Sequence, residues 1–114
     1  MYRIATMEVS DVREVHNQLL ARHARGRIGK GRYFDGARPC CLLGHAIDIM
    51  GYDDLDAMAK DFDETTTFPD EGDFGVIIYF NDNRSQTSAI KMFIELLTRR
   101  VIYAKMVRET ADGQ

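Results

Sequence analysis

The stretch RPCCLLGHAID (residues 38–48) contains two adjacent cysteines, a run of apolar side chains and a histidine one helical turn after the second cysteine. Pro39 suits the first position of a helix, where its missing N–H group is not needed, and Gly51 is a natural helix end. The segment between them is apolar on nearly every side, which is typical of a helix that is buried all round. We therefore predict a buried helix over residues 39–50 at the centre of the fold.

Two amphipathic helices are predicted to flank this central helix. Over residues 10–25, apolar side chains recur at intervals of three and four behind Ser10, which can cap the helix. Over residues 88–108 the same periodicity returns, and the basic C-terminal half of this segment suits the helix dipole. The side chains that can cap this last helix are those of Ser85, Thr87 and Ser88. The pattern predicts a mainly α, compact single domain of three to four helices.

The segments between these helices are less regular. Residues 52–62 are predicted to form a short surface helix, and residues 63–73 an acidic loop that Pro69 and Gly72 interrupt. The segment 76–80 is rich in β-branched and aromatic residues, so it is consistent with a buried strand or with a turn of helix. A strand there would need a partner, and only residues 2–5 offer one. A small two-stranded β element over residues 2–5 and 76–80 is therefore one of two alternatives.

Length and composition limit the remaining possibilities. The chain has 114 residues, of which 45% are hydrophobic, so it is long enough for one domain with a real core. We expect residues 1–114 to form that domain, with an ordered core over about 4–108 and a frayed tail over 109–114. No run approaches the roughly 20 apolar residues that a membrane-spanning helix needs, and no secretory signal pattern opens the sequence. We expect no association with membranes.

The cysteines indicate the cellular setting. Cys40 and Cys41 are the only two, and adjacent cysteines form a strained disulfide that makes a poor cross-link. Reduced thiols are typical of the cytoplasm, which is the expected location. The same count rules out a closed four-cysteine zinc site, and we expect no bound metal and no cofactor.

Charge is segregated along the chain although the net charge is only −3. Residues 22–38 carry six Lys or Arg against one acid, residues 48–82 carry eleven acids against one base, and residues 83–108 carry six bases against one acid. Two interpretations are open: the basic and acidic surfaces compensate each other across the fold, or one of them is a functional patch.

A catalytic interpretation of the central helix uses Cys41, His45 and Asp48. A thiol in the first turn of a helix is activated by the dipole, and His45 follows Cys41 by four residues on the same face. Asp48 could orient the imidazole, which would complete a nucleophile, a base and an orienting group. Two side chains stacked along one buried helix leave little room for a substrate, however, so no catalytic residue is favoured.

Two other interpretations of the same residues remain. A metal would need a third ligand beyond Cys41 and His45, and only His16 or His23 could supply it. The structural interpretation is the stronger one. In it, Gly44 lets another backbone approach, Cys41 fills a tight space, and His45 bonds to a buried carbonyl or carboxylate. The side chains that we expect to meet this helix, or to cap the next one, are those of Asn81, Asp82 and Thr87.

The segment RGRIGKGRYFDGAR (residues 25–38), hereafter the basic loop, is the candidate binding surface. Its four glycines in fourteen residues predict a loop, and its glycine spacing does not match a phosphate-binding Walker loop. Gly26–Gly29 matches the GXXG pattern of KH domains, but no helix follows directly. The residues that we expect to contact an anionic partner are Arg25, Arg27, Lys30, Arg32 and Tyr33.

Several of these residues fall into a familiar pattern: Cys41-Leu-Leu-Gly44, then Ile47, then Asn81-Asp82, then Thr87 before a final apolar helix. The pattern resembles a family of small uncharacterised domains common in actinobacteria, phages and prophages, and it covers roughly residues 10–104. The chain departs from it at His45, where the family usually has alanine, and at Phe80, where a tryptophan is frequent. The resemblance implies a mainly helical domain and no activity.

Taken together, these features favour a non-catalytic accessory or regulatory protein that acts through a protein partner. The resemblance favours a phage or prophage origin, and for a protein of that origin we expect a host factor as the partner that it inhibits. One alternative is a nucleic-acid-binding protein that uses residues 25–32, and the other is a small cysteine-dependent enzyme that uses Cys41 and His45. The sequence leaves the oligomeric state open.

Overall fold

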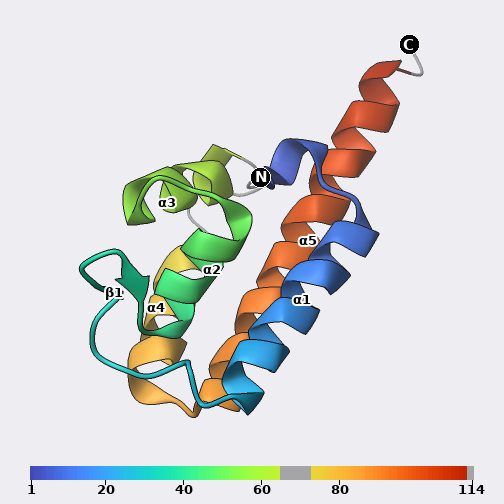
Figure 1. The fold of residues 1–114 in the computed structure, drawn as a ribbon. Coiled ribbons are helices and arrows are strands. Elements are labelled where there is room, and N and C mark those ends of the chain that lie inside the picture. The colour runs from blue at the N-terminus through green and yellow to red at the C-terminus, as the bar shows by residue number, and fades with distance from the viewer. Residues whose placement is uncertain (65–72, 113–114) are drawn as a thin grey trace.

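Most of the chain is helical in the computed structural model, which describes residues 1–64 and 73–112 (Figure 1). A short 3₁₀-helix, η1, precedes five α-helices, and two very short strands lie between the first two of these. In chain order the elements are η1 (Ile4–Thr6), α1 (Val9–Ala24), β1 (Phe34–Asp35), β2 (Arg38–Pro39), α2 (Leu42–Met50), α3 (Leu55–Glu64), α4 (Asp73–Asn83) and α5 (Gln86–Asp112). The predicted mainly α fold is confirmed.

The short helix α2 occupies the centre, as the apolar pattern predicted. It contacts each of the other four α-helices, while α1 and α5 lie side by side along the length of the molecule (Figure 1). Seven of its nine residues are buried: Leu42, Leu43, Gly44, His45, Ala46, Ile47 and Met50. The surrounding core comes mainly from α1 and α5, through side chains such as Val15, Leu19, Phe93 and Leu97.

The small antiparallel sheet lies in a different place from the one predicted. Phe34 pairs with Pro39 and Asp35 with Arg38, so the two strands form a hairpin inside the basic loop. The segment 76–80 is part of helix α4, and residues 4–6 form η1, so the proposed strand pair of 2–5 and 76–80 is wrong. A run of five apolar residues fits a buried helix as well as a strand, and here the segment is helical and packs against α2 and α5.

Helix α2 begins later than predicted. Pro39 lies in strand β2, and the helix starts only at Leu42, with Cys41 as its N-cap residue in an extended conformation. Neither cysteine is therefore inside the first helical turn. Gly51 ends the helix as expected, with φ of +77° in the left-handed region that glycine adopts without strain.

The ends of the flanking helices also differ in detail. Glu8, and not Ser10, is the N-cap residue of α1, and its N–H group donates to the Asp11 carboxylate over 2.8 Å. In α5 the cap is Ser85, whose hydroxyl accepts the Ser88 N–H group at 3.2 Å. Helix α5 continues to Asp112, so residues 109–112 of the predicted frayed tail are helical. The rest of that tail, residues 113–114, and residues 65–72 of the predicted acidic loop lie outside the described residues.

The N-terminal segment is fastened to α2 and α3 by buried polar contacts. The Tyr2 N–H group donates to the Met50 carbonyl over 2.9 Å, and the Ile4 N–H group donates to Asp61 over 3.1 Å. The same Asp61 carboxylate accepts the Tyr52 hydroxyl. Burial, followed by the neighbouring Asp61, raises the pKa of Tyr52 far above its ordinary value, so this phenol stays a proton donor. Within the described residues, no helix combines the length and apolar character that crossing a bilayer requires.

Candidate functional site: a basic loop anchored on a buried histidine

The basic loop folds back over the start of α2 and is held there by its backbone. The Cys40 N–H group donates to the Tyr33 carbonyl over 2.9 Å, and the Cys41 N–H group donates to the Arg32 carbonyl over 3.0 Å. From the other side, the Gly29 N–H group donates to the Cys40 carbonyl over 2.7 Å. These hydrogen bonds fix the backbone path of a segment that is mostly irregular.

Gly44 is the point where the loop touches α2. A β-carbon built at this position would lie 1.9 Å from the Tyr33 carbonyl oxygen and 2.9 Å from its carbonyl carbon. Only glycine allows the loop backbone to lie this close to the helix. The predicted role of Gly44, a close approach by another backbone, is therefore confirmed, and the approaching segment is the basic loop itself.

His45 links the loop to α1 and α2 through both of its ring nitrogens. An Arg22 guanidinium nitrogen lies 3.1 Å from Nδ1, and Nε2 lies 3.1 Å from the Arg27 carbonyl oxygen. Because an arginine can only donate, Nδ1 must accept, and Nε2 must then carry the proton and donate it to the carbonyl. His45 is 1% exposed. The arrangement assigns one tautomer of a neutral, buried imidazole.

The electrostatics of His45 agree with this assignment. Burial is the main cause that lowers the pKa of His45 below its usual value, and the nearby Arg22 and Arg27 charges lower it further. The hydrogen bond to the Arg27 carbonyl and the Asp48 carboxylate act in the opposite direction. The net effect is a histidine that stays neutral at pH 7 and serves as a fixed hydrogen-bonding group.

The predicted catalytic trio is not assembled by this geometry. Asp48 does not orient the imidazole, because its carboxylate forms a 2.8 Å ion pair with Arg22. Cys41 is fully buried at the helix N-cap, and both nitrogens of His45 are already engaged by Arg22 and Arg27. A proton transfer from the Cys41 thiol would require these contacts to break.

The contacts that we predicted for Asn81, Asp82 and Thr87 also differ from those observed. Asn81 is buried, but its amide donates to its neighbour Asp82 over 3.1 Å and not to His45. The Thr87 hydroxyl lies 3.5 Å from Nε2 of His23, and Thr87 does not cap α5. Burial, followed by the negative charge of Asp82, raises the pKa of Tyr33 in the basic loop.

The metal interpretation gains no support from the placement of its ligands. Both nitrogens of His45 are occupied, and Nε2 of His23 lies 3.5 Å from the Thr87 hydroxyl. Among the residues that the structure describes, no three or more His, Cys, Asp or Glu side chains gather as a metal would require.

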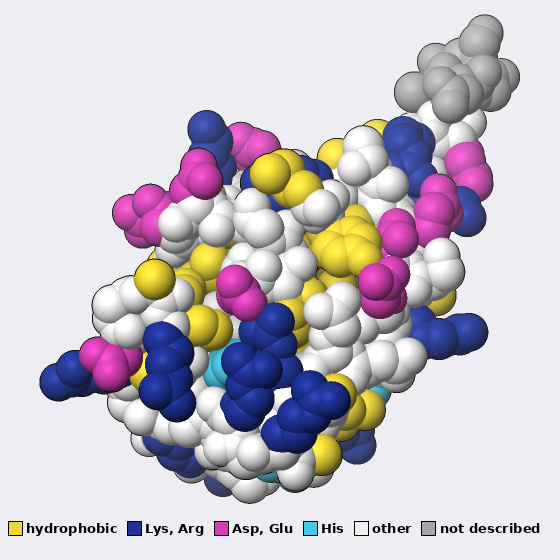
Figure 2. Space-filling model, viewed as in Figure 1, with side chains coloured by type: hydrophobic (Ala, Val, Ile, Leu, Met, Phe, Trp, Pro, Cys, Tyr) yellow, Lys and Arg dark blue, Asp and Glu magenta, His cyan; other side chains and the backbone are white. Residues whose placement is uncertain are grey.

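Lys and Arg side chains gather over the basic loop and the end of α1, whereas most Asp and Glu side chains in the same view lie toward the opposite end (Figure 2). Of the residues predicted to bind a partner, Arg25, Arg27, Lys30 and Arg32 are exposed. Tyr33 is half-buried and packs against the core, so it belongs to the foundation of the loop more than to its outer face.

A hollow of about 340 Å³ lies in this basic surface. The charged side chains that line it are Arg27, Lys30, Arg38 and Asp35, and Cys40 lies beside them. The Cys40 thiol is half-exposed and not part of a disulfide. Lys30 is partly committed elsewhere, because its ammonium donates to the Arg84 carbonyl at 2.5 Å, just beyond the end of α4. Arg27 and Arg38 are therefore the cations most available to an anion in the hollow.

Sequence analysis missed three contributors to this site. Arg38 belongs to the basic run over residues 22–38, but it is not among the residues predicted to bind. Arg22 belongs to the same run, and no prediction anticipated that it bonds both His45 and Asp48. The Arg27 carbonyl carries no sequence signal at all. The charge run over residues 22–38 is the one feature that could have pointed to Arg22 and Arg38.

A scan of the chain against protein-family models found no matching family, and searches among curated proteins and among solved structures found no significant relative. The family resemblance drawn from the Cys41, Gly44 and Asn81-Asp82 pattern therefore stays a prediction.

Proposed function

We propose that this chain is a non-catalytic binding protein that holds an acidic segment of a protein partner on its basic loop. The observation that carries the proposal is the anchoring of Arg27. Its carbonyl is fixed by His45 and its N–H group donates to the Arg22 carbonyl over 3.0 Å, while its side chain stays exposed. A cation on a fixed backbone binds an anion with less loss of conformational freedom than one on a mobile tail.

Three features favour a protein partner over nucleic acid. Tyr33 and Phe34 are partly buried and pack against the core, which leaves them less ring surface for base stacking than exposed aromatics offer. Asp35 lies in the hollow among the cations, where it would repel a continuous line of phosphates. The whole chain carries a net charge of −3, whereas nucleic-acid-binding domains are typically strongly basic. Isolated carboxylates of a folded partner or peptide suit this mixed surface better.

The resemblance described from the sequence extends this proposal to a phage- or prophage-encoded protein that inhibits a host factor. In that setting the chain acts in the reducing cytoplasm, where Cys40 and Cys41 persist as thiols. Inhibition requires no chemistry on the part of this chain, since occupation of a partner's acidic surface is enough to exclude other ligands.

A direct test measures fluorescence anisotropy with three labelled probes of equal charge: a glutamate-rich peptide, a single-stranded oligonucleotide and a duplex. We expect the peptide to bind most tightly and its affinity to fall as salt is raised. The double variant Arg27→Ala, Arg38→Ala should weaken peptide binding by about tenfold, because two of the cations that line the hollow are lost.

The matched control is the double variant Arg13→Ala, Lys91→Ala, which removes the same charge from exposed positions on α1 and α5. It should bind the peptide within about twofold of the unaltered protein. Tighter binding of either oligonucleotide than of the peptide would replace the proposal by the nucleic-acid alternative. Equal losses in the two double variants would show that net charge, and not the basic loop, attracts the probe.

A further inference from the structure

Helix α5 carries a regular stripe on the side that faces away from the core. The stripe, hereafter the α5 seam, repeats with spacings of three and four residues, which is the heptad spacing of helices that pair with one another. Its members, all exposed, are Glu95, Arg99, Ile102, Met106 and Glu109. On the opposite side of the same helix, Leu97 and Val101 are fully buried against the core. Helix α5 thus has two differently composed faces, and only one of them is used within the chain.

The apolar residues of the seam are open to solvent. Ile102 is 45% exposed and Met106 is 60% exposed, which makes them two of the most exposed large apolar side chains in the described residues. The C-terminal turns of α5 extend beyond the rest of the molecule (Figure 1). Ile102 and Met106 are therefore open to contact by a second helix.

We propose that the α5 seam pairs with the α5 seam of a second copy of this chain in antiparallel orientation. With the pair centred near residue 104, Ile102 packs on Met106 of the second copy, and two-fold symmetry repeats the contact in reverse. The next position on either side sets Arg99 opposite Glu109 of the second copy. Two Arg99–Glu109 ion pairs then flank the apolar centre, and each copy contributes one cation and one anion to them.

The charges select this orientation. A parallel pairing in register would set Arg99 opposite Arg99 and Glu109 opposite Glu109, which is unfavourable at both positions. Arg99 already bonds Glu95 of its own helix over 3.2 Å, but both side chains are about half exposed or more. The guanidinium has five N–H donors, so it can keep this contact while it meets Glu109 of the second copy.

The contact extends over about three helical turns, which is less than the area that stable dimers bury. The dimer is therefore transient and concentration-dependent. Since it uses the outer face of α5, it is independent of the basic loop and of the function proposed for that loop.

The test uses two charge-reversal variants, each of which has like charges at both outer positions. R99E is acidic at both, and E109R is basic at both. Sedimentation equilibrium over a range of concentrations should show that each variant alone self-associates at least about tenfold more weakly than the unaltered chain. An equimolar mixture of the two should associate again, because opposite charges then meet at both positions of the mixed pair.

Circular dichroism confirms beforehand that both variants remain helical, and Arg13→Glu on the exposed face of α1 serves as the charge control, with unchanged association. If a variant does not fold, the double variant Ile102→Ser, Met106→Ser tests the apolar centre and should abolish association. A mixture that associates no better than its components would overturn the antiparallel pairing. An unaltered chain that stays monomeric up to millimolar concentration would overturn the dimer altogether.

Discussion

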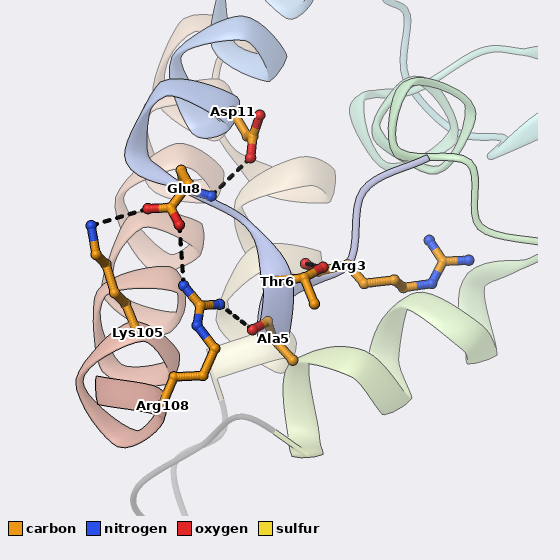
Figure 3. A network of polar contacts seen from close by, with 7 residues as sticks. All are labelled: Arg3, Ala5, Thr6, Glu8, Asp11, Lys105 and Arg108. Atoms are coloured by element: carbon orange, nitrogen blue, oxygen red, sulfur yellow. Dashed lines mark hydrogen bonds and ion pairs between the residues drawn. The ribbon is translucent and has the colours of Figure 1, made fainter. Parts of the chain in front are cut away.

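The polar contacts that stabilise the two ends of the molecule differ in their exposure to solvent. At the basic end, one buried imidazole joins α2 to Arg22 and to the Arg27 carbonyl. At the other end, the exposed Glu8 carboxylate forms ion pairs with Lys105 at 3.0 Å and with Arg108 at 3.3 Å (Figure 3).

The difference shows that a count of contacts is a poor guide to their contribution. The cluster around Glu8 is larger, since Arg108 also donates to the Ala5 carbonyl and Asp11 accepts the Glu8 N–H group (Figure 3). Its partners are solvated in both the folded and the unfolded chain, so their net contribution is small. The His45 contacts are few, but a buried group that loses its partner keeps the full cost of desolvation. We expect the basic end to be the more sensitive one.

The largest effect is expected from Gly44→Ala. The new methyl group would overlap the Tyr33 carbonyl, and neither backbone can move without disturbing α2 or the basic loop. We expect a loss of about 3 kcal/mol in the free energy of unfolding. Urea denaturation followed by circular dichroism measures it. Gly29→Ala in the same loop is the control, since its nearest contact would be 3.8 Å away, and it should change stability by less than about 1 kcal/mol. Similar losses in both variants would contradict the assigned role of Gly44.

The second effect is that of His45→Ala, which leaves the Arg27 carbonyl without its donor and opens a cavity at the loop base. We expect a loss of about 2–3 kcal/mol together with faster hydrogen exchange at the amides of Gly29, Cys40 and Cys41. Asp48→Ala is its counterpart in the same cluster. Because Asp48 is half-exposed, this variant should lose under about 1 kcal/mol. If Asp48→Ala proves the more damaging change, the ion pair and not the imidazole anchors the loop.

The third prediction concerns the effect of low pH on the stability that His45 contributes at the basic end. The pKa of His45 is lowered in the folded state, whereas the unfolded chain takes up a proton near pH 6.5. The unfolded state therefore binds more protons below that pH, and the stability that His45 contributes is complete above it and falls as the pH is lowered. The slope from this residue is at most about 1.4 kcal/mol per pH unit. The difference in free energy of unfolding between the unaltered protein and His45→Ala should decrease from pH 7 to pH 5. An increase would contradict the lowered pKa of His45.

The smallest effect is expected from Glu8→Gln, which keeps the shape of the side chain and removes its charge. The loss should be under about 1 kcal/mol in dilute buffer and should nearly vanish in 1 M salt, because these ion pairs are exposed. Denaturation of both proteins at the two salt concentrations gives the comparison. A loss as large as that of His45→Ala would remove the distinction between the two ends.

The sequence was sufficient to predict the helices whose apolar residues recur with a clear period. The segments 10–25 and 88–108 correspond closely to α1 and α5, and residues 39–50 contain the buried helix α2. It was insufficient for residues 76–80, because a continuous apolar run has no period that separates strand from helix. It also missed the hairpin at Phe34–Pro39, whose two-residue strands are too short to leave a pattern.

Of the candidate site, the residue types could be predicted but not their partners. The basic loop and the importance of Gly44 followed from composition and from the physics of glycine. The hydrogen-bond partners of His45 could not be predicted in this way, because they depend on how the chain turns after α1. At that turn Gly26 adopts a φ of +68°, and the Arg27 carbonyl points toward α2. Such a contact joins residues eighteen positions apart through a backbone atom that every residue possesses.

The pairing of α1 with α5 determines when the fold can be completed during synthesis. Helix α1 is translated before the other four α-helices, whereas its main packing partner, α5, is translated after all of them. The apolar side chains of Val12, Val15 and Leu19 therefore stay incompletely covered until α5 has been synthesised. Products of premature termination would keep this stripe uncovered, and such uncovered stripes are what chaperones and quality-control proteases bind. Synthesis of α5 is therefore a condition for covering the apolar stripe of α1.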